Sequence, residues 1–114
     1  MSSIRTKPAD LLEHEFAQEK ASALGRVGRA LEAALAALAE FDARHPPEPS
    51  GHQAARAALV AQASAALWHF VVQREACGLR DTRLVLRDYR VPAEVAARMG
   101  TWPQPQARRP RRKP

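Results

Sequence analysis

The chain has 114 residues, 46% of them hydrophobic and 26% charged, which fits one ordinary globular domain. Alanine supplies 24 residues and aromatic residues only 5%, a balance that favours helices over strands and predicts an all-α fold. Five of the 18 lysines and arginines lie in the last seven positions, leaving 13 basic against 12 acidic residues elsewhere, so a uniformly basic nucleic-acid-binding surface is not indicated.

The first predicted helix runs from about Pro8 to Ala43. Proline suits the first turn, and Asp10 and Glu13 suit the positive end of the helix dipole. Apolar residues three or four positions apart form one stripe, made of Leu12, Phe16, Leu24, Val27, Leu31, Ala34, Leu38 and Phe41. The sequence His45-Pro46-Pro47 ends this helix.

Gly25 and Gly28 lie inside the first helix, away from its main apolar stripe. Each costs about 1 kcal/mol relative to alanine. They form either a small-residue patch that another helix approaches closely, or a tolerated weak point with a slight kink. The sequence leaves both interpretations open.

The second predicted helix runs from Ser50 to about Cys77. Ser50 and Gln53 match a capping box at its start, and Gly78 followed by Leu79 is a typical end. Trp68 and Val72 lie opposite its main apolar face. Because both sides are apolar, something besides the first helix must cover them, and we take these two residues as interface candidates.

Two short helices follow, one over Thr82–Asp88 with Asp81 as its N-cap, and one that Pro92 opens and Gly100 stops. We expect residues 1–7 to be flexible, 8–102 to form the helical domain, and 103–114 to be a disordered Pro/Arg-rich basic tail. The candidate phosphate contacts all lie in this tail and are Arg108, Arg109, Arg111, Arg112 and Lys113.

The lengths of the two long helices predict self-association. At 1.5 Å per residue they extend roughly 50 and 40 Å, and the short loop between them requires an antiparallel hairpin. The two short helices cover only part of such a hairpin, so an apolar strip stays exposed. A homodimer that completes a four-helix bundle is the expected closure, and an unknown protein partner is a further option.

Arg74 falls within the apolar stripe of the second helix and therefore needs a partner. Pairing the hairpin about its loop predicts ion pairs between Glu19 and Arg74 and between Lys20 and Glu75. Arg80 and Asp81 extend this network. We favour a charged clamp that fixes the helix register over a ligand pocket.

No catalytic or metal-binding constellation is visible. Cys77 and His69 are eight positions apart, about 12 Å along one helix, too far for a nucleophile and its base. The four histidines form no zinc motif, and one cysteine cannot make a zinc knuckle. We therefore expect no catalytic residue, metal or cofactor.

The single cysteine, the absence of a visible secretory signal and the lack of a membrane-length apolar run predict a cytoplasmic protein without a membrane partner.

Two resemblances bear on function. "YRVPAEVAARMG" resembles the middle helix of a helix-turn-helix motif, but the proline-rich Trp102–Gln106 follows where a recognition helix is required, which argues against DNA reading. "EKASALGRVGRALEAALAAL", "VQREACGLRD" and "RDYRVPAEVAARMG" resemble a family of short uncharacterised helical proteins from alphaproteobacteria. That resemblance implies a small helical protein and supplies no activity, ligand or catalytic residue.

The function class that the sequence favours is a non-enzymatic interaction or scaffold protein that self-associates. The alternative is nucleic-acid association through the basic tail. An enzyme is the least favoured class.

Overall fold

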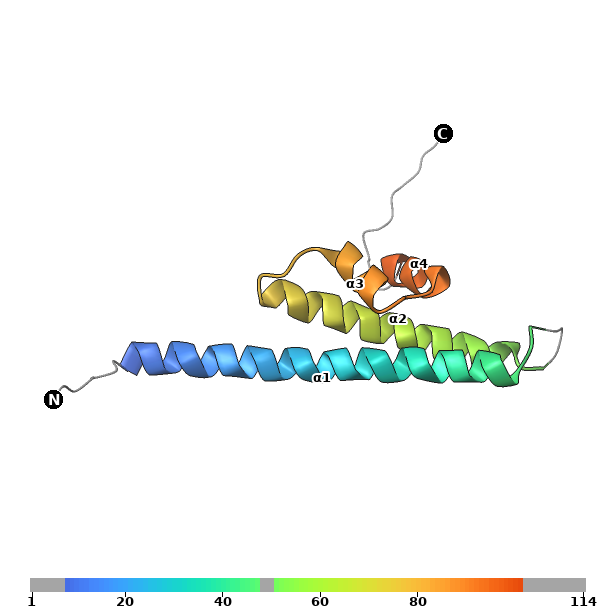
Figure 1. Ribbon diagram of the computed structural model, residues 1–114, viewed down its shortest axis with the longest axis horizontal. Coiled ribbons are helices and arrows are strands. Elements are labelled where there is room, and N and C mark those ends of the chain that lie inside the picture. Colours follow the sequence, from blue (N-terminus) through green and yellow to red (C-terminus); the bar gives the residue numbers. More distant parts are fainter. Residues whose placement is uncertain (1–7, 48–50, 102–114) are drawn as a thin grey trace, which may run out of the picture.

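The computed structural model describes residues 8–47 and 51–101, and these ranges contain four α-helices and no strand (Figure 1). The helices are α1 (Pro8–Arg44), α2 (Gln53–Ala76), α3 (Thr82–Asp88) and α4 (Ala93–Thr101). The predicted all-α class is confirmed.

The two long helices lie side by side, and α2 runs back along α1 in the opposite direction (Figure 1). Their contact is built from the apolar stripe of α1 and one face of α2, with Leu31 and Leu67 fully buried. The buried hydrophobic core consists of Leu31, Leu38, Val60, Ala63, Leu67, Phe70, Val85 and Val95.

The two short helices pack against α2 (Figure 1), and Tyr89, which follows α3, also reaches α1 beside Gly28. The buried hydroxyl of Ser64 donates to the carbonyl oxygen of Val95 at 3.0 Å, which ties α4 to the middle of α2. Val85 of α3 and Val95 are almost completely buried, so α3 and α4 each contribute one residue to the core.

By length and composition α2 is the one helix, among the described residues, that is apolar enough to cross a membrane. Core helices of soluble proteins share this property. In this fold α2 supplies Val60, Ala63, Leu67 and Phe70 to the core, and 28% of its most apolar 18-residue stretch is buried against the other helices.

The start of α2 differs from the prediction. The helix begins at Gln53, and its N-cap is His52, which makes no side-chain capping hydrogen bond. The predicted helical start at Ser50 lies outside the described residues.

The end of α2 confirms the predicted glycine cap. Gly78 has φ +87°, a left-handed conformation that glycine adopts without strain. The Leu79 amide donates to the Arg74 carbonyl at 2.8 Å, and the Gly78 amide donates to the Glu75 carbonyl at 2.9 Å. These are the two hydrogen bonds of a Schellman motif.

The starts of α3 and α4 agree with the prediction, and the end of α4 does not. The Asp81 side chain accepts a hydrogen bond from the Arg83 amide at 3.1 Å, which confirms Asp81 as the N-cap of α3. Pro92 precedes α4, and its carbonyl accepts from the Val95 amide at 3.0 Å. The helix continues through Gly100 to Thr101, so Gly100 does not stop it as predicted.

The end of α3 repeats the Schellman pattern without a glycine. Arg90 has φ +53°, its amide donates to the Arg87 carbonyl at 3.1 Å, and the Val91 amide donates to the Leu86 carbonyl at 2.9 Å. A side chain in the left-handed region costs about 1–2 kcal/mol. The turn at Arg90, between α3 and α4, is therefore locally strained.

The first part of α1 extends beyond the end of α2 (Figure 1). The sulfur of Cys77 lies 4.0 Å from the carbonyl oxygen of Lys20, so α2 ends level with Lys20. Residues 8–19, which we call the overhang, project roughly 18 Å past that point. In the overhang the large apolar side chains are exposed: Leu11 by 51%, Leu12 by 53% and Phe16 by 63%.

The two left-handed positions give a matched stability test. Arg90→Gly relieves the strain at the end of α3 and is expected to raise the free energy of unfolding by about 0.5–1 kcal/mol. Gly78→Ala introduces the same strain at the end of α2 and is expected to lower it by about 1 kcal/mol. Urea denaturation followed by circular dichroism measures both changes. Equal effects of the same sign would contradict the assigned backbone conformations.

Candidate functional site

The strongest polar cluster joins three helices at the end of the molecule where α1 leads into α2. Arg56, in the first turn of α2, lies between Asp42 near the end of α1 and Glu94 near the start of α4. We call these three residues the Arg56 clamp. They lie far from the polar network that the sequence analysis predicted.

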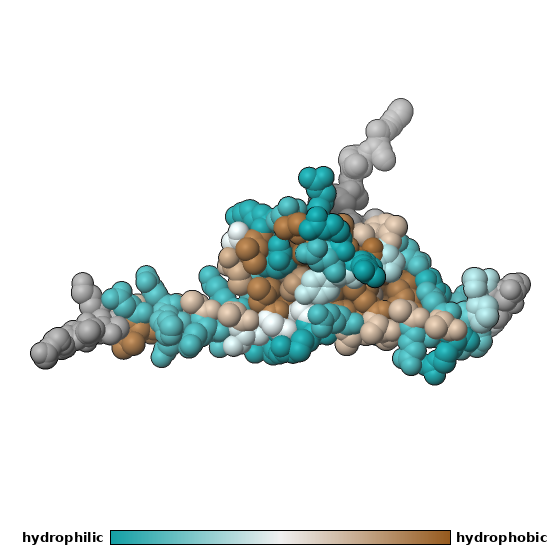
Figure 2. Space-filling model, viewed as in Figure 1, coloured by the Kyte–Doolittle hydropathy of each residue, from teal (hydrophilic) through white to brown (hydrophobic). Residues whose placement is uncertain are grey.

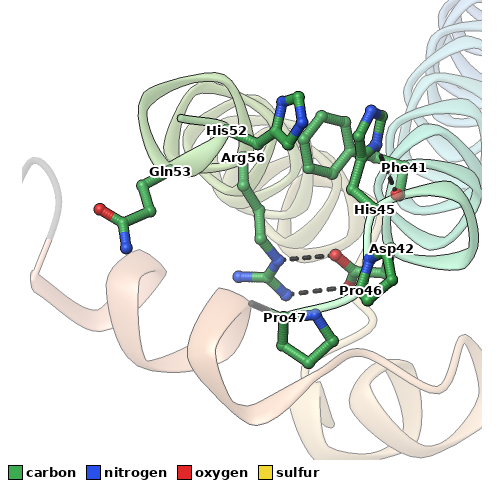
Figure 3. Close-up of a pocket in the computed structure, with 8 residues that line it drawn as sticks. All are labelled: Phe41, Asp42, His45, Pro46, Pro47, His52, Gln53 and Arg56. Atoms are coloured by element: carbon green, nitrogen blue, oxygen red, sulfur yellow. Dashed lines mark hydrogen bonds and ion pairs between the residues drawn. The ribbon is translucent and has the colours of Figure 1, made fainter. Parts of the chain in front are cut away.

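The clamp is bidentate on both sides. Arg56 Nε and Nη2 donate to the two oxygens of Asp42 at 2.7 and 3.0 Å, as Figure 3 shows. Nη1 and Nη2 donate to the two oxygens of Glu94 at 2.9 and 2.6 Å. Four of the five guanidinium hydrogens are therefore committed to carboxylates of this chain.

The clamp shifts the titration of all three groups. Hydrogen bonds from Arg56, opposed by desolvation, lower the pKa of Asp42 and of Glu94. The hydrogen bonds to Glu94 and then to Asp42 raise the pKa of Arg56. The side chains are 34–48% exposed, so water screens the ion pairs and each contributes modestly to stability.

The sequence did carry a signal for this clamp. Arg56 is the only charged residue between Gln53 and Gln73, in a stretch made mostly of alanine and larger apolar residues. A lone arginine in such a run needs a carboxylate partner. The partners could not be identified because they come from two other helices.

An aromatic cluster lies beside the clamp. The rings of His45 and Phe41 are stacked with centroids 4.1 Å apart, and the rings of His45 and His52 lie 4.3 Å apart. His45 Nδ1 lies 3.0 Å from the Phe41 carbonyl oxygen, which fits the tautomer with a proton on Nδ1. This arrangement holds the chain after α1 against the start of α2 (Figure 3).

Arg56, Asp42 and the three rings line an open cleft of about 420 Å³, whose other lining residues are Pro46, Pro47 and Gln53 (Figure 3). The cleft offers little chemistry. Its guanidinium is occupied by carboxylates, and the described residues that line it include no serine, cysteine or lysine. No three His, Cys, Asp or Glu side chains come together to hold a metal ion in the part of the chain that the structure describes.

The predicted Glu19–Arg74 ion pair is not formed. Glu19 instead lies 3.8 Å from Arg26, two helical turns along α1. The Arg74 guanidinium sits over the Phe70 ring at 5.9 Å and donates to the Asp81 carbonyl at 3.4 Å. Arg74 thus finds its partners within α2 and the turn that follows it.

A register difference explains this correction. Cys77 lies beside Lys20, and Phe70 beside Gly28, which places Arg74 level with about Leu24. That is more than one turn from Glu19. Within the described residues Lys20, Glu75 and Arg80 form no ion pair, so the predicted Lys20–Glu75 pair is absent too.

The two glycines of α1 have different surroundings. Gly28 is buried, and a Cβ there would lie 3.2 Å from Phe70 Cε1 and 3.6 Å from the Tyr89 hydroxyl. At Gly25 a Cβ would meet only the flexible end of Arg29, at 3.4 Å. The close approach predicted for the small-residue patch therefore occurs at Gly28. It is made by Phe70 and Tyr89 of the same chain.

The other two interface candidates, Trp68 and Val72, differ in how far they are exposed. Trp68 is partly buried and lies one helical turn after Ser64. The Ser64 hydroxyl donates the hydrogen bond to Val95 of α4. Val72 is 41% exposed. The second apolar side of α2 is thus covered in part by α4, and its end remains open. The candidate phosphate contacts Arg108, Arg109, Arg111, Arg112 and Lys113 lie outside the described residues.

Comparison with known proteins adds a family and no activity. The model of a family described as "Family of unknown function (DUF6665)" matches residues 4–107. No curated protein and no solved structure matches the chain.

Alanine substitutions distinguish the two glycines. Gly25→Ala is expected to raise the free energy of unfolding by up to about 1 kcal/mol, because only helix propensity changes. Gly28→Ala gains the same propensity but forces Phe70 to shift, so it is expected to be at least about 1 kcal/mol less stable than Gly25→Ala. Chemical denaturation measures the difference. Equal stabilities would contradict the close contact at Gly28.

Removing the clamp should change how stability depends on pH. A carboxyl group whose pKa is lowered in the folded state stabilises the fold above its unfolded pKa, about 3.9 for Asp and 4.3 for Glu. This stabilisation is lost as the pH falls through the folded-state pKa. Arg56→Met is therefore expected to lower stability at pH 7 and to flatten its decline towards pH 3.

Arg44→Met is the matched control, because Arg44 forms an exposed pair with Glu40 at 3.9 Å within one helix. Its pH profile should follow that of the unmodified protein. Denaturation at a series of pH values measures all three proteins. Identical profiles for the two variants would show that the clamp does not depress the carboxyl pKa values.

Proposed function

The chain belongs to this family of unknown function, and we propose that it is a non-enzymatic helical interaction protein that forms a homodimer. The observation that carries the proposal is the overhang. Its three large apolar side chains, Leu11, Leu12 and Phe16, are each more than half exposed. Large apolar side chains exposed together on one projecting segment mark a surface that associates with a partner.

A non-enzymatic role is supported by the state of the reactive side chains. The cleft beside the Arg56 clamp holds an arginine that two carboxylates already occupy. Cys77 is partly buried at the end of α2, and its sulfur lies 4.0 Å from the carbonyl oxygen of Lys20 rather than beside a histidine. Neither arrangement resembles a nucleophile with its base.

A homodimer is also the simplest way to complete the fold. Two copies bring four long helices into one assembly, and the exposed overhang favours contact at the ends of the helices over the four-helix bundle that the sequence predicted. Closed two-fold association uses the same surface twice, so one apolar region per chain is enough. We place this dimer in the cytoplasm, where a chain with a single cysteine needs no disulfide.

Analytical ultracentrifugation tests the proposal. At micromolar concentrations the protein is expected to sediment with twice the 12.6 kDa mass of the chain. Circular dichroism on the same samples verifies that the protein is helical. A well-folded monomer across this concentration range would overturn the proposal.

A further inference from the structure

At the base of the overhang the molecule forms a step. The floor of the step is the exposed side of α1, and its wall is the end of α2, at Ala76 and Cys77 (Figure 1). The groove between floor and wall measures about 580 Å³, and its floor residues are Glu13, Phe16, Ala17, Lys20, Ala21 and Leu24. Figure 2 shows apolar surface on the projecting part of α1 among hydrophilic residues.

The apolar part of the floor has a defined direction. Leu12 and Phe16 are four residues apart, so they lie on the same side of α1. Leu11 is five residues before Phe16, which places it about 140° away around the helix. Phe16 lines the groove and Leu11 does not. A partner in the step would therefore cover Phe16 and leave Leu11 in solvent.

The overhang is acidic. It carries four carboxylates and one histidine, and no lysine or arginine. Glu19 pairs with Arg26, whereas Asp10, Glu13 and Glu15 form no ion pair among the described residues. Three carboxylates thus lie near exposed apolar side chains and pair with no cation of the described residues 8–47 and 51–101.

The segment at and after the end of α2 is weakly basic. Residues 72–84 contain three arginines and two acidic residues. Of these arginines, Arg80 and Arg83 form no ion pair within residues 8–47 and 51–101. They lie in the same part of the sequence as three exposed apolar residues, Val72, Leu79 and Leu84. We call residues 72–84 the basic junction.

We propose that the occupant of the step is a second copy of this chain, whose overhang lies antiparallel on the first overhang about a two-fold axis. In this arrangement the acidic overhang of each copy reaches the basic junction of the other. The interface is self-complementary in shape, because each copy offers one projecting helix and one step. It is also complementary in charge, because unpaired carboxylates meet unpaired arginines.

This inference rests on the proposed homodimer and adds where the two copies meet. It differs from a bundle in which the α1–α2 pairs pack side by side along their full length. Here the two copies overlap only at the ends where α2 stops. Ion pairs across such an exposed interface weaken as salt is added.

The apolar contact is tested first, with Phe16→Glu against the matched control Leu11→Glu. Both residues are exposed on the same overhang, so both variants should fold with unchanged helical content and thermal midpoint. Phe16→Glu is expected to raise the dimer Kd at least about tenfold, and Leu11→Glu less than about twofold, measured by sedimentation equilibrium. Equal effects of the two variants would overturn the proposed interface.

The charge contact is tested with two double variants, Asp10→Arg/Glu13→Arg and Arg80→Glu/Arg83→Glu. Each alone places like charges together at both symmetric contacts, so each should dimerise weakly. Mixed in equal amounts, they should form a heterodimer close to the original affinity, because both contacts are then restored. Failure of the mixture to restore association would overturn the reciprocal arrangement.

Further outcomes separate this inference from the proposed function. A monomeric unmodified protein overturns both. A dimer that Phe16→Glu leaves intact overturns only the location and favours side-by-side packing. Truncation after Ala107 should leave the Kd unchanged, and a loss of dimer equal to that of Phe16→Glu would instead assign the step to the basic tail.

Discussion

One guanidinium group holds two carboxylates at once at the end of the molecule where α1 leads into α2. Arg56 joins the beginning of α2 to the end of α1 through Asp42, and to the beginning of α4 through Glu94. Because each contact is bidentate, it restricts orientation as well as distance. The stacked rings of Phe41 and His45 add an apolar contact at the same end. These contacts fix the register at this end, while the apolar core between the helices supplies most of the stability.

The overhang is a direct consequence of this fixed end. With the loop end held, the difference between the 37 residues of α1 and the 24 residues of α2 must appear at the other end. There α2 stops level with Lys20, since Gly78 ends the helix whatever lies beside it. Extending α2 would have covered Phe16 within the chain. The position of a single glycine thus decides how much of α1 stays exposed.

Features that depend on neighbouring residues could be predicted from the sequence, and features that depend on register could not. The caps at Gly78 and Asp81 need only local backbone geometry, so their residue types are sufficient. The partner of Arg74 depends on how far α2 is shifted along α1, which is set by contacts between the two helices that lie far from Arg74 in the sequence. Because the observed register of α2 along α1 differs from the predicted one, Arg74 contacts the Asp81 carbonyl and not Glu19. Gly28 likewise became interpretable only once Phe70 and Tyr89 were placed beside it.

The overhang contributes no residue to the core. Every core residue, and every apolar residue packed against it, lies between Leu24 and Met99. It therefore adds no buried apolar contact to the fold, while its exposed apolar groups lower solubility. Its acidic groups and the arginines of the basic junction form no ion pair with each other inside one chain. In the proposed dimer, a second copy covers the exposed apolar side chains of the overhang and pairs its carboxylates with the arginines of the basic junction. The residues by which α1 exceeds α2 then form the interface.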